Sequence, residues 1–214
     1  MTHATDNGRG GRRYDAVVFD LLTALLDSWT LWNRVAGSDD LGLKWRLQYL
    51  TLTYEAGAYR PYERIIHEAA ERAGVPAQRA DDLLQNWADL KPWPEAEGVL
   101  DTLAERVPLG IATNSSDRLA AIAVRAAGGR FAAVATAESA GSYKPRPEPY
   151  RQVLERLGIA PERVLFVAGS AADVPGASGV GMPVYWHNRR GLPAVGDVQP
   201  LYTERSLTPL LDLV

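Results

Sequence analysis

The sequence predicts an α/β fold, in which a doubly wound parallel sheet carries a small all-helical domain inserted after the first strand. Two observations support this prediction. From residue 97 onward, short apolar runs alternate with segments of helical periodicity, which is the pattern of right-handed strand–helix–strand units. Between residues 28 and 90, in contrast, aromatic residues and leucines recur only at helical spacing.

The first strand is expected at residues 16–19, which read AVVF. A short run of branched and aromatic residues is typical of a strand that is buried on both faces of a parallel sheet. The run ends at an acid, Asp20. Because ligands of open parallel sheets bind beyond the carboxyl ends of the strands, Asp20 is expected to project into the binding crevice.

The helical insertion is expected to span residues 27–90, so that residues 14–26 and 91–214 form the sheet domain. Glycine-containing breaks at residues 37–40, at Gly57 and at residues 74–76 divide the insertion into several helices. Prolines at positions 92 and 94 end it, since proline stops a helix. Residues 1–13 are polar and glycine-rich, which favours a flexible tail.

Strands and helices alternate after the insertion. Helices are expected at residues 97–105, 118–127, 148–157 and 173–178, and strands at residues 109–113, 132–137, 164–167 and 183–186. Polar residues follow the strands: Thr113 and Asn114 come after one, and Lys144 and Asp173 after two others. Together with Asp20, these side chains would meet at one edge of the sheet. Two carboxylates, a lysine and a hydroxyl–amide pair in one crevice indicate a nucleophilic carboxylate site.

The composition narrows the class of protein. The formal net charge of -3 and a pI of about 5.7 do not favour nucleic acid or an anionic membrane as a partner. The absence of cysteine excludes disulfides and thiolate chemistry, and it fits a reducing compartment. No signal-peptide core and no apolar run of membrane-spanning length is present, so a cytoplasmic protein is expected. The three histidines are scattered without the spacing of metal ligands.

Four motifs of the expected sheet domain and one motif of the insertion occur in order along the chain. FDLLTALLD contains Asp20, and WRLQY in the insertion contains Arg46. The pair Thr113-Asn114 comes next, followed by YKPRP with Tyr150 a few residues later, and then by FVAGSAAD. From about residue 14 onward, the chain resembles the haloacid dehalogenase (HAD) superfamily, and most of all its L-2-haloacid dehalogenases. The resemblance implies a Rossmann-like HAD core with a helical cap.

The resemblance implies a catalytic role for three residues. Asp20 matches the nucleophile, which would attack a carbon that bears a halide and form an ester. Lys144 would keep that carboxylate ionised, and Asp173 would activate the hydrolytic water. Purely structural roles are open to the same residues: Asp20 and Asp173 both have the placement of helix caps, and Lys144 could be a solvated loop residue.

Five residues are implied in substrate binding. Arg46 matches the arginine that holds the substrate carboxylate and the halide, although a solvated arginine is the ordinary expectation on an amphipathic helix. Thr113 and Asn114 would donate hydrogen bonds to the substrate, or would cap the next helix. Tyr150 and Ser170 match motif positions that line the substrate site.

The chain departs from the family at several of these positions. Ala24 stands where the dehalogenases favour threonine, and Ala168 and Gly169 replace the polar or acidic pair of the fourth motif. Ser170 replaces an asparagine, and Ala172 replaces a bulky tryptophan of the substrate pocket. The lost hydrogen-bond donors argue against efficient turnover, and the small residue at position 172 predicts a wider pocket.

Phosphatases of this superfamily bind Mg²⁺ through an acid at the position of Gly169 and carry a second acid at the position of Leu22. Because Mg²⁺ prefers carboxylate ligands, the sequence predicts a site that works without a metal or other cofactor.

The predicted function is therefore hydrolysis of a 2-haloacid through an aspartyl ester, with a small anionic organic acid as substrate. A phosphatase that acts on a small phosphate ester is one alternative, for which Mg²⁺ would be needed. A HAD-fold binding protein that has lost catalysis is the other. A homodimer is also possible, because related dehalogenases commonly form one.

Overall fold

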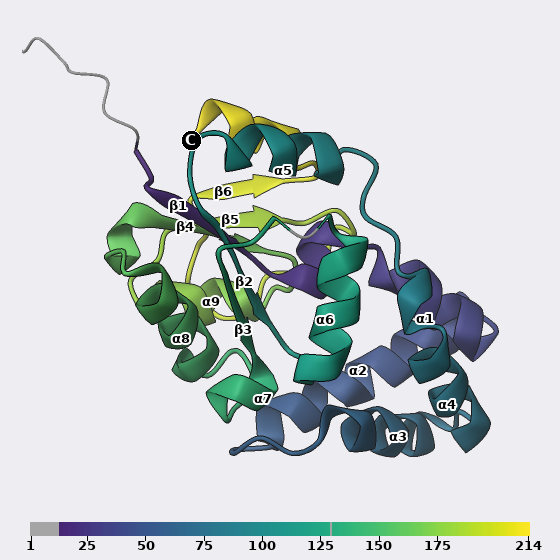
Figure 1. The fold of residues 1–214 in the computed structure, drawn as a ribbon. Helices are drawn as coiled ribbons and strands as arrows, with labels where there is room; N and C mark the ends of the chain where they lie inside the picture. The colour runs from purple at the N-terminus through teal and green to yellow at the C-terminus, as the bar shows by residue number, and fades with distance from the viewer. Residues whose placement is uncertain (1–12, 129) are drawn as a thin grey trace, which may run out of the picture.

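The computed structural model describes residues 13–128 and 130–214, and residues 1–12 of the predicted tail lie outside the described residues. A six-stranded sheet has the order β3-β2-β1-β4-β5-β6, and all neighbouring strands are parallel (Figure 1). The strands are β1 (Ala16–Phe19), β2 (Leu109–Thr113), β3 (Ala133–Thr136), β4 (Val164–Ala168), β5 (Val184–His187) and β6 (Tyr202–Glu204). The predicted α/β class with a doubly wound parallel sheet is confirmed.

Strand β1 lies in the middle of the sheet, between β2 and β4. Its last residue, Phe19, pairs with Ile111 of β2 and with Val167 of β4. The next residue continues the ladder, since the Asp20 backbone N–H donates to the Val167 carbonyl at 2.9 Å. The strand order changes direction between β1 and β4, which is where open α/β sheets bind their ligands. Asp20 therefore lies at the position of the sheet where a binding site is expected.

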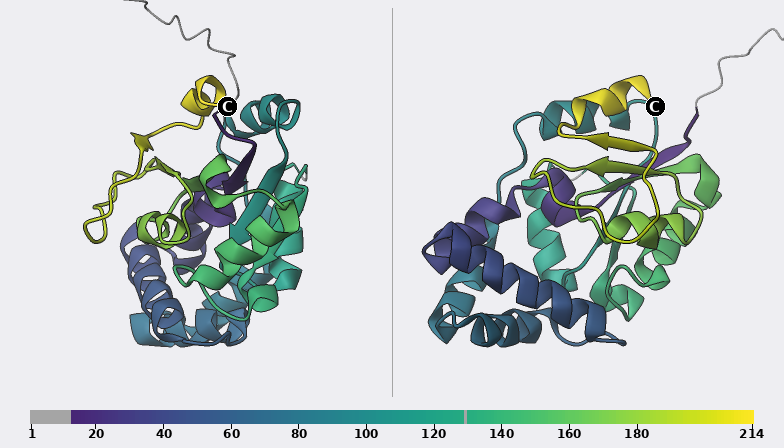
Figure 2. Two further views of the ribbon diagram at one scale, coloured as in Figure 1. Left: turned by 90° about the vertical axis from the view of Figure 1, so that its left-hand side faces the viewer. Right: turned by 180° about the vertical axis from the view of Figure 1, so that it is seen from behind.

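Successive residues of β1 face opposite sides of the sheet and enter two separate cores. Val17 and Phe19 pack with α5 (Ala96–Ala104), α6 (Asp117–Ala126) and the C-terminal 3-10 helix η4 (Thr208–Asp212). Ala16 and Val18 pack with α8 (Pro147–Leu157) and α9 (Asp173–Ser178) on the other face. Figures 1 and 2 show the sheet with these helices on both of its faces. Two shorter elements, α7 (Ala137–Ala140) and η3 (Pro161–Arg163), lie in the connections.

Strand β6 was not predicted from the sequence. It is only three residues long, at the edge of the sheet, and its side chains are partly or fully exposed. The segment therefore has no apolar run, which was the signal used for the other strands. The five predicted strands and four predicted helices of the sheet region are present, with ends that differ by a residue or so.

The insertion between β1 and α5 is helical, as predicted. It contains α1 (Ser28–Ala36), α2 (Asp39–Glu55), α3 (Tyr62–Ala73), α4 (Ala77–Gln85) and the 3-10 turn η2 (Trp87–Asp89). Gly37 and Gly74 end α1 and α3 with φ angles of 93° and 73°, in the left-handed region that glycine adopts without strain. We refer to α1–α4 and η2 as the helical layer.

A chain of aromatic contacts forms the interior of the helical layer. Trp45 packs on Trp32, Trp32 on Tyr49, Tyr49 on Tyr62 and Tyr62 on Trp87, with ring centroids 4.8–6.0 Å apart. These residues belong to the same buried cluster as one face of the sheet. The boundaries of two separate domains at residues 27 and 90 therefore stay a prediction.

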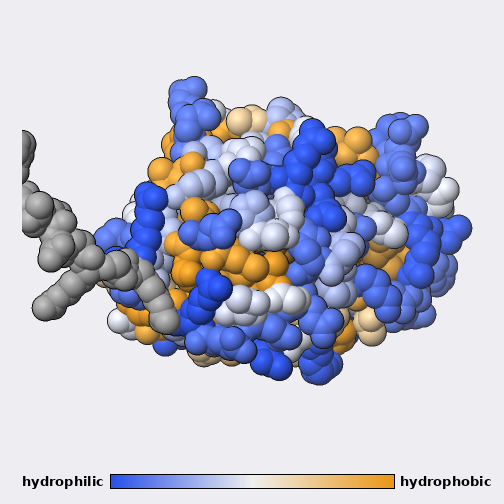
Figure 3. Space-filling view, turned by 90° about the horizontal axis from the view of Figure 1, so that it is seen from above, coloured by the Kyte–Doolittle hydropathy of each residue, from blue (hydrophilic) through white to orange (hydrophobic). Residues whose placement is uncertain are grey.

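The surface is mostly polar on the face seen from above Figure 1, where apolar side chains form small patches among hydrophilic ones (Figure 3). Among the described residues, no helix combines the length and the apolar character that crossing a membrane would require.

Candidate active site

Asp20 leaves β1 and caps the helical turn that follows it. This turn, η1 (Leu21–Leu25), is a π-helix, and the Asp20 side chain accepts the N–H groups of Thr23 at 2.9 Å and Ala24 at 3.2 Å. The Thr23 hydroxyl donates to the same oxygen, Oδ2, at 2.6 Å. Asp20 is therefore a helix cap through its Oδ2. Its Oδ1 faces a cavity, so the cap does not conflict with the expected role as nucleophile.

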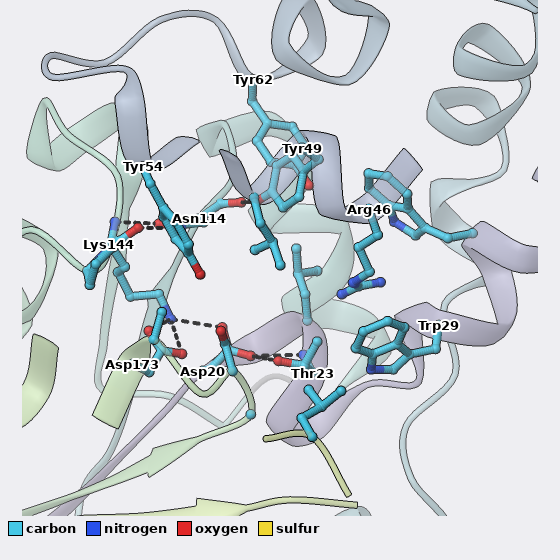
Figure 4. A pocket seen from close by; sticks show the side chains of 18 residues that line it. Asp20, Thr23, Trp29, Arg46, Tyr49, Tyr54, Tyr62, Asn114, Lys144 and Asp173 are labelled. Atoms are coloured by element: carbon cyan, nitrogen blue, oxygen red, sulfur yellow. Dashed lines mark hydrogen bonds and ion pairs between the residues drawn. The ribbon is translucent and has the colours of Figure 1, made fainter. Parts of the chain in front are cut away.

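Lys144 lies between two buried carboxylates. Its Nζ is 2.9 Å from Asp20 Oδ1 and 3.1 Å from both oxygens of Asp173 (Figure 4). Only 2% of Lys144 is exposed, which contradicts the alternative of a solvated loop residue. Burial alone would lower the pKa of Lys144, but the two carboxylates outweigh burial and raise it, so the ammonium group stays charged.

The two carboxylates differ in pKa. Burial would raise the pKa of Asp20, but Lys144 and the hydrogen bonds from Thr23 outweigh it, so the pKa of Asp20 is lowered. Burial is the larger effect at Asp173, and with the negative charge of Asp20 it raises the pKa of Asp173 despite Lys144. One carboxylate is thus held ionised and the other is made more basic, which suits a nucleophile and a general base.

Asp173 does not cap the helix that it begins. Its oxygens instead meet Lys144 and the hydroxyl of Tyr150, which donates to Oδ1 at 2.7 Å. Tyr150 does not belong to the cavity lining. Its position supports a role in orienting Asp173 rather than the predicted direct contact with a substrate.

The Asn114 side chain holds the backbone of Lys144 in place. Its Oδ1 accepts the Lys144 backbone N–H at 2.7 Å and its Nδ2 donates to the Lys144 carbonyl at 3.0 Å. Asn114 lines the cavity, but both ends of its amide are already bonded. Thr113 is fully buried in β2 and lies outside the cavity lining, and its hydroxyl has no hydrogen-bond partner within residues 13–128 and 130–214. Ser116, not this pair, caps α6.

Arg46 of α2 reaches the same cavity from the helical layer (Figure 4). It is 6% exposed, its Nη2 donates to the Ser28 hydroxyl at 2.8 Å, and its guanidinium carbon lies 4.1 Å from the ring centre of Trp29. Its buried Nη1 has no hydrogen-bond partner among the described residues. An unpaired donor of a buried cation is costly, so this nitrogen is suited to an anionic ligand.

The cavity lies between the helical layer and the carboxyl end of the sheet. Its volume is about 70 Å³. Because one water molecule needs about 10–15 Å³, the cavity suits a small organic molecule. Besides the residues above, its lining includes Leu22, Trp29, Trp32, Tyr49, Leu50, Tyr62 and Leu192.

Tyr54 is a lining residue that the sequence did not reveal. It comes from the last turn of α2 and points toward the carboxylates (Figure 4). Burial raises the pKa of Tyr54, and hydrogen bonding with the predicted substrate residue Ser170 opposes that rise. The small residue Ala172 also lines the cavity, and it was the reason to predict a wider pocket. Tyr54 lines the same cavity and takes up part of its space, which that prediction left out.

The described residues do not fit a magnesium ion. A Cβ atom at Gly169 would lie 2.3 Å from both the Thr23 hydroxyl and the Ala24 nitrogen, so an acidic side chain has no room there. The Lys144 ammonium already lies between the two carboxylates, and the described residues contain no group of three or more potential metal ligands. Mg²⁺ needs several oxygen ligands, which this set does not supply.

A family model described as haloacid dehalogenase-like hydrolase matches residues 14–181. The chain belongs to the haloacid dehalogenase-like hydrolases. It is therefore an enzyme of the hydrolase class.

Curated members of this hydrolase family are similar along most of their length. Haloacetate dehalogenase H-2 of Moraxella sp. (strain B) is 29% identical over 197 residues, which cover 84% of this chain and 88% of the relative. The (S)-2-haloacid dehalogenase of Xanthobacter autotrophicus is 29% identical over 188 residues, which cover 79% and 73%. The crystal structure of the L-2-haloacid dehalogenase RSc1362 superposes with a TM-score of 0.83 at 26% identity, and covers 93% of this chain and 97% of that one.

Proposed function

We propose that this hydrolase cleaves the carbon–halogen bond of a small 2-haloacid by way of a covalent ester on Asp20. The observation that carries the proposal is the pairing of two groups in one cavity: an ionised, buried carboxylate, and a buried guanidinium nitrogen that has no partner in the described part of the chain. The names of the Moraxella and Xanthobacter relatives, a haloacetate and a 2-haloacid dehalogenase, support this substrate class.

In the first step, Asp20 Oδ1 attacks C2 of the substrate. A C–O bond forms, the carbon–halogen bond breaks with inversion, and the halide leaves with the bonding electrons. Arg46 Nη1 holds the substrate carboxylate or the departing halide, and the Trp29 ring supports its guanidinium group. Lys144 keeps the attacking oxygen ionised.

In the second step, water hydrolyses the ester. Asp173 accepts a proton from the water, whose oxygen attacks Cγ of Asp20. The bond between Cγ and Oδ1 then breaks, Oδ1 takes the proton back from Asp173 to give a 2-hydroxyacid, and the second proton of the water passes to solvent. The raised pKa of Asp173 makes it a stronger base than an ordinary aspartate. Neither step needs a metal or another cofactor.

The test is halide release from L- and D-2-haloacids and from haloacetates in the presence of EDTA. We expect release by the wild type, and a loss of at least about 10⁴-fold in Asp20→Asn, because the nucleophile is removed. Asp101→Asn, an exposed site on α5, is the control that should retain release. No halide from the wild type, together with Mg²⁺-dependent phosphate release from a phosphate ester, would instead support the phosphatase. Neither activity would support a binding protein.

A further inference from the structure

The two oxygens of the Asp20 carboxylate have very different surroundings. Oδ2 accepts three hydrogen bonds, from the Thr23 hydroxyl and from the backbone N–H groups of Thr23 and Ala24. Among the described residues, only Lys144 donates to Oδ1. The carboxylate is therefore fixed in rotation, with Oδ1 directed to the cavity and Oδ2 directed into η1 (Figure 4).

This asymmetry determines what each oxygen becomes during the reaction. Oδ1 would be the ester oxygen, because the oxygen with three donors is the weaker nucleophile. Oδ2 would then be the carbonyl oxygen of the ester. When water attacks Cγ, the electron pair of the C=O bond moves onto Oδ2, which already lies among three donors. Preorganised donors at an atom where charge develops are the basis of an oxyanion hole.

On the basis of the proposed function, we propose that Thr23 is a catalytic residue of the hydrolytic step. Its hydroxyl donates to the oxyanion on Oδ2 while Asp173 takes the proton of the water. When the tetrahedral intermediate collapses, the C=O bond re-forms and the bond between Cγ and Oδ1 breaks. Oδ1 takes the proton from Asp173 and leaves in the 2-hydroxyacid, and the remaining proton of the water passes to solvent. Asp20 thereby regains a carboxylate with one oxygen from water.

The hydroxyl comes from position 23 and not from position 24, where related dehalogenases favour a threonine. Ala24 has no side-chain donor, but the π-helical turn directs the Thr23 hydroxyl to Asp20. The turn also comes so close to Gly169 that a Cβ there would lie 2.3 Å from the Thr23 hydroxyl. Gly169 thus leaves the space that the Thr23 side chain needs, and the two departures at positions 24 and 169 belong to one arrangement.

The test separates the two chemical steps in wild type, Thr23→Val, Thr23→Ala and Thr23→Ser. Rapid quenching with a 2-haloacid, followed by mass spectrometry of the Asp20 peptide, gives the rates of ester formation and ester hydrolysis. We expect Thr23→Val and Thr23→Ala to slow hydrolysis by about 10²-fold and to accumulate the ester, since loss of one oxyanion donor has an effect of that order. Ester formation should slow much less than hydrolysis, because Lys144 and the backbone N–H groups of residues 23 and 24 still stabilise the ionised Asp20. Thr23→Ser should hydrolyse the ester like the wild type.

Two results would overturn this role without affecting the proposed function. One is an unchanged rate of hydrolysis in Thr23→Val and Thr23→Ala. The other is an equal loss in both steps, which would indicate that Thr23 only maintains the structure. A wild type that forms no ester with any 2-haloacid would overturn the proposed function, and the role of Thr23 with it.

Discussion

At the scale of single residues, Lys144 donates to two buried carboxylates and favours the ionised form of both, yet their pKa values move in opposite directions. Asp20 has three further donors on Oδ2, and these help Lys144 to overcome the cost of burial. Among the described residues, Asp173 has one further side-chain donor, the Tyr150 hydroxyl, and burial remains the larger effect. The difference in hydrogen-bond donors therefore accounts for the difference in pKa, and it supports the proposed roles of Asp20 as nucleophile and Asp173 as base.

The base can be tested through its pKa. Tyr150→Phe removes a donor that stabilises the ionised Asp173, so the pKa of Asp173 should rise further. Turnover needs the ionised base and is lost as the pH falls through this pKa, so the acid limb of the kcat profile should move to higher pH. A shift of about one unit corresponds to a hydrogen bond to a charged group. Tyr185→Phe, whose hydroxyl bonds to the Ser206 carbonyl, is the matched control and should leave the profile unchanged.

At the scale of elements, η1 must pass very close to the end of β4. In Gly169→Ala, the new Cβ would meet the Ala24 nitrogen and the Thr23 hydroxyl at 2.3 Å, and the backbone would have to move. We expect the free energy of unfolding, measured with urea, to fall by about 1–3 kcal/mol.

Gly98 offers a matched control for that substitution. It lies inside α5, where an added Cβ would meet nothing within 4 Å. Gly98→Ala should raise the free energy of unfolding by about 0.5–1 kcal/mol, because alanine favours a helix. If Gly169→Ala were as stable as the wild type, the close approach of η1 would not constrain this position.

At the scale of the whole molecule, α2 has apolar residues on both of its sides. Trp45 and Tyr49 are buried in the helical layer, but Leu43 and Leu47 are 44% and 52% exposed. A helix that is apolar on its outer side is a candidate for contact with a second copy of the chain. This feature supports the predicted homodimer.

Light scattering after size exclusion tests the homodimer. We expect a mass of twice 23.3 kDa for the wild type and of 23.3 kDa for Leu47→Glu, because a charge in an apolar interface is unfavourable. Val198→Glu, an exposed site in the loop before β6 rather than on α2, should remain dimeric. A monomeric wild type would show that the prediction of a homodimer is wrong.

The parallel sheet, apart from its edge strand β6, and the three charged residues at its carboxyl edge could be predicted from the amino-acid sequence. Asp20, Lys144 and Asp173 were expected to meet because each follows a recognisable apolar strand, and the carboxyl ends of parallel strands share one edge. The breaks at Gly37 and Gly74 were also readable, because their left-handed conformations need glycine.

The use of the remaining polar groups depends on tertiary packing. Thr23 was missed because helical periodicity does not predict a π-turn, and Tyr54 because its place depends on how α2 packs over the sheet. Asn114 and Tyr150 were expected at the substrate, yet their side chains bond to Lys144 and Asp173. A motif carries the identity and order of residues, whereas the direction of a side chain depends on packing between segments far apart in the chain.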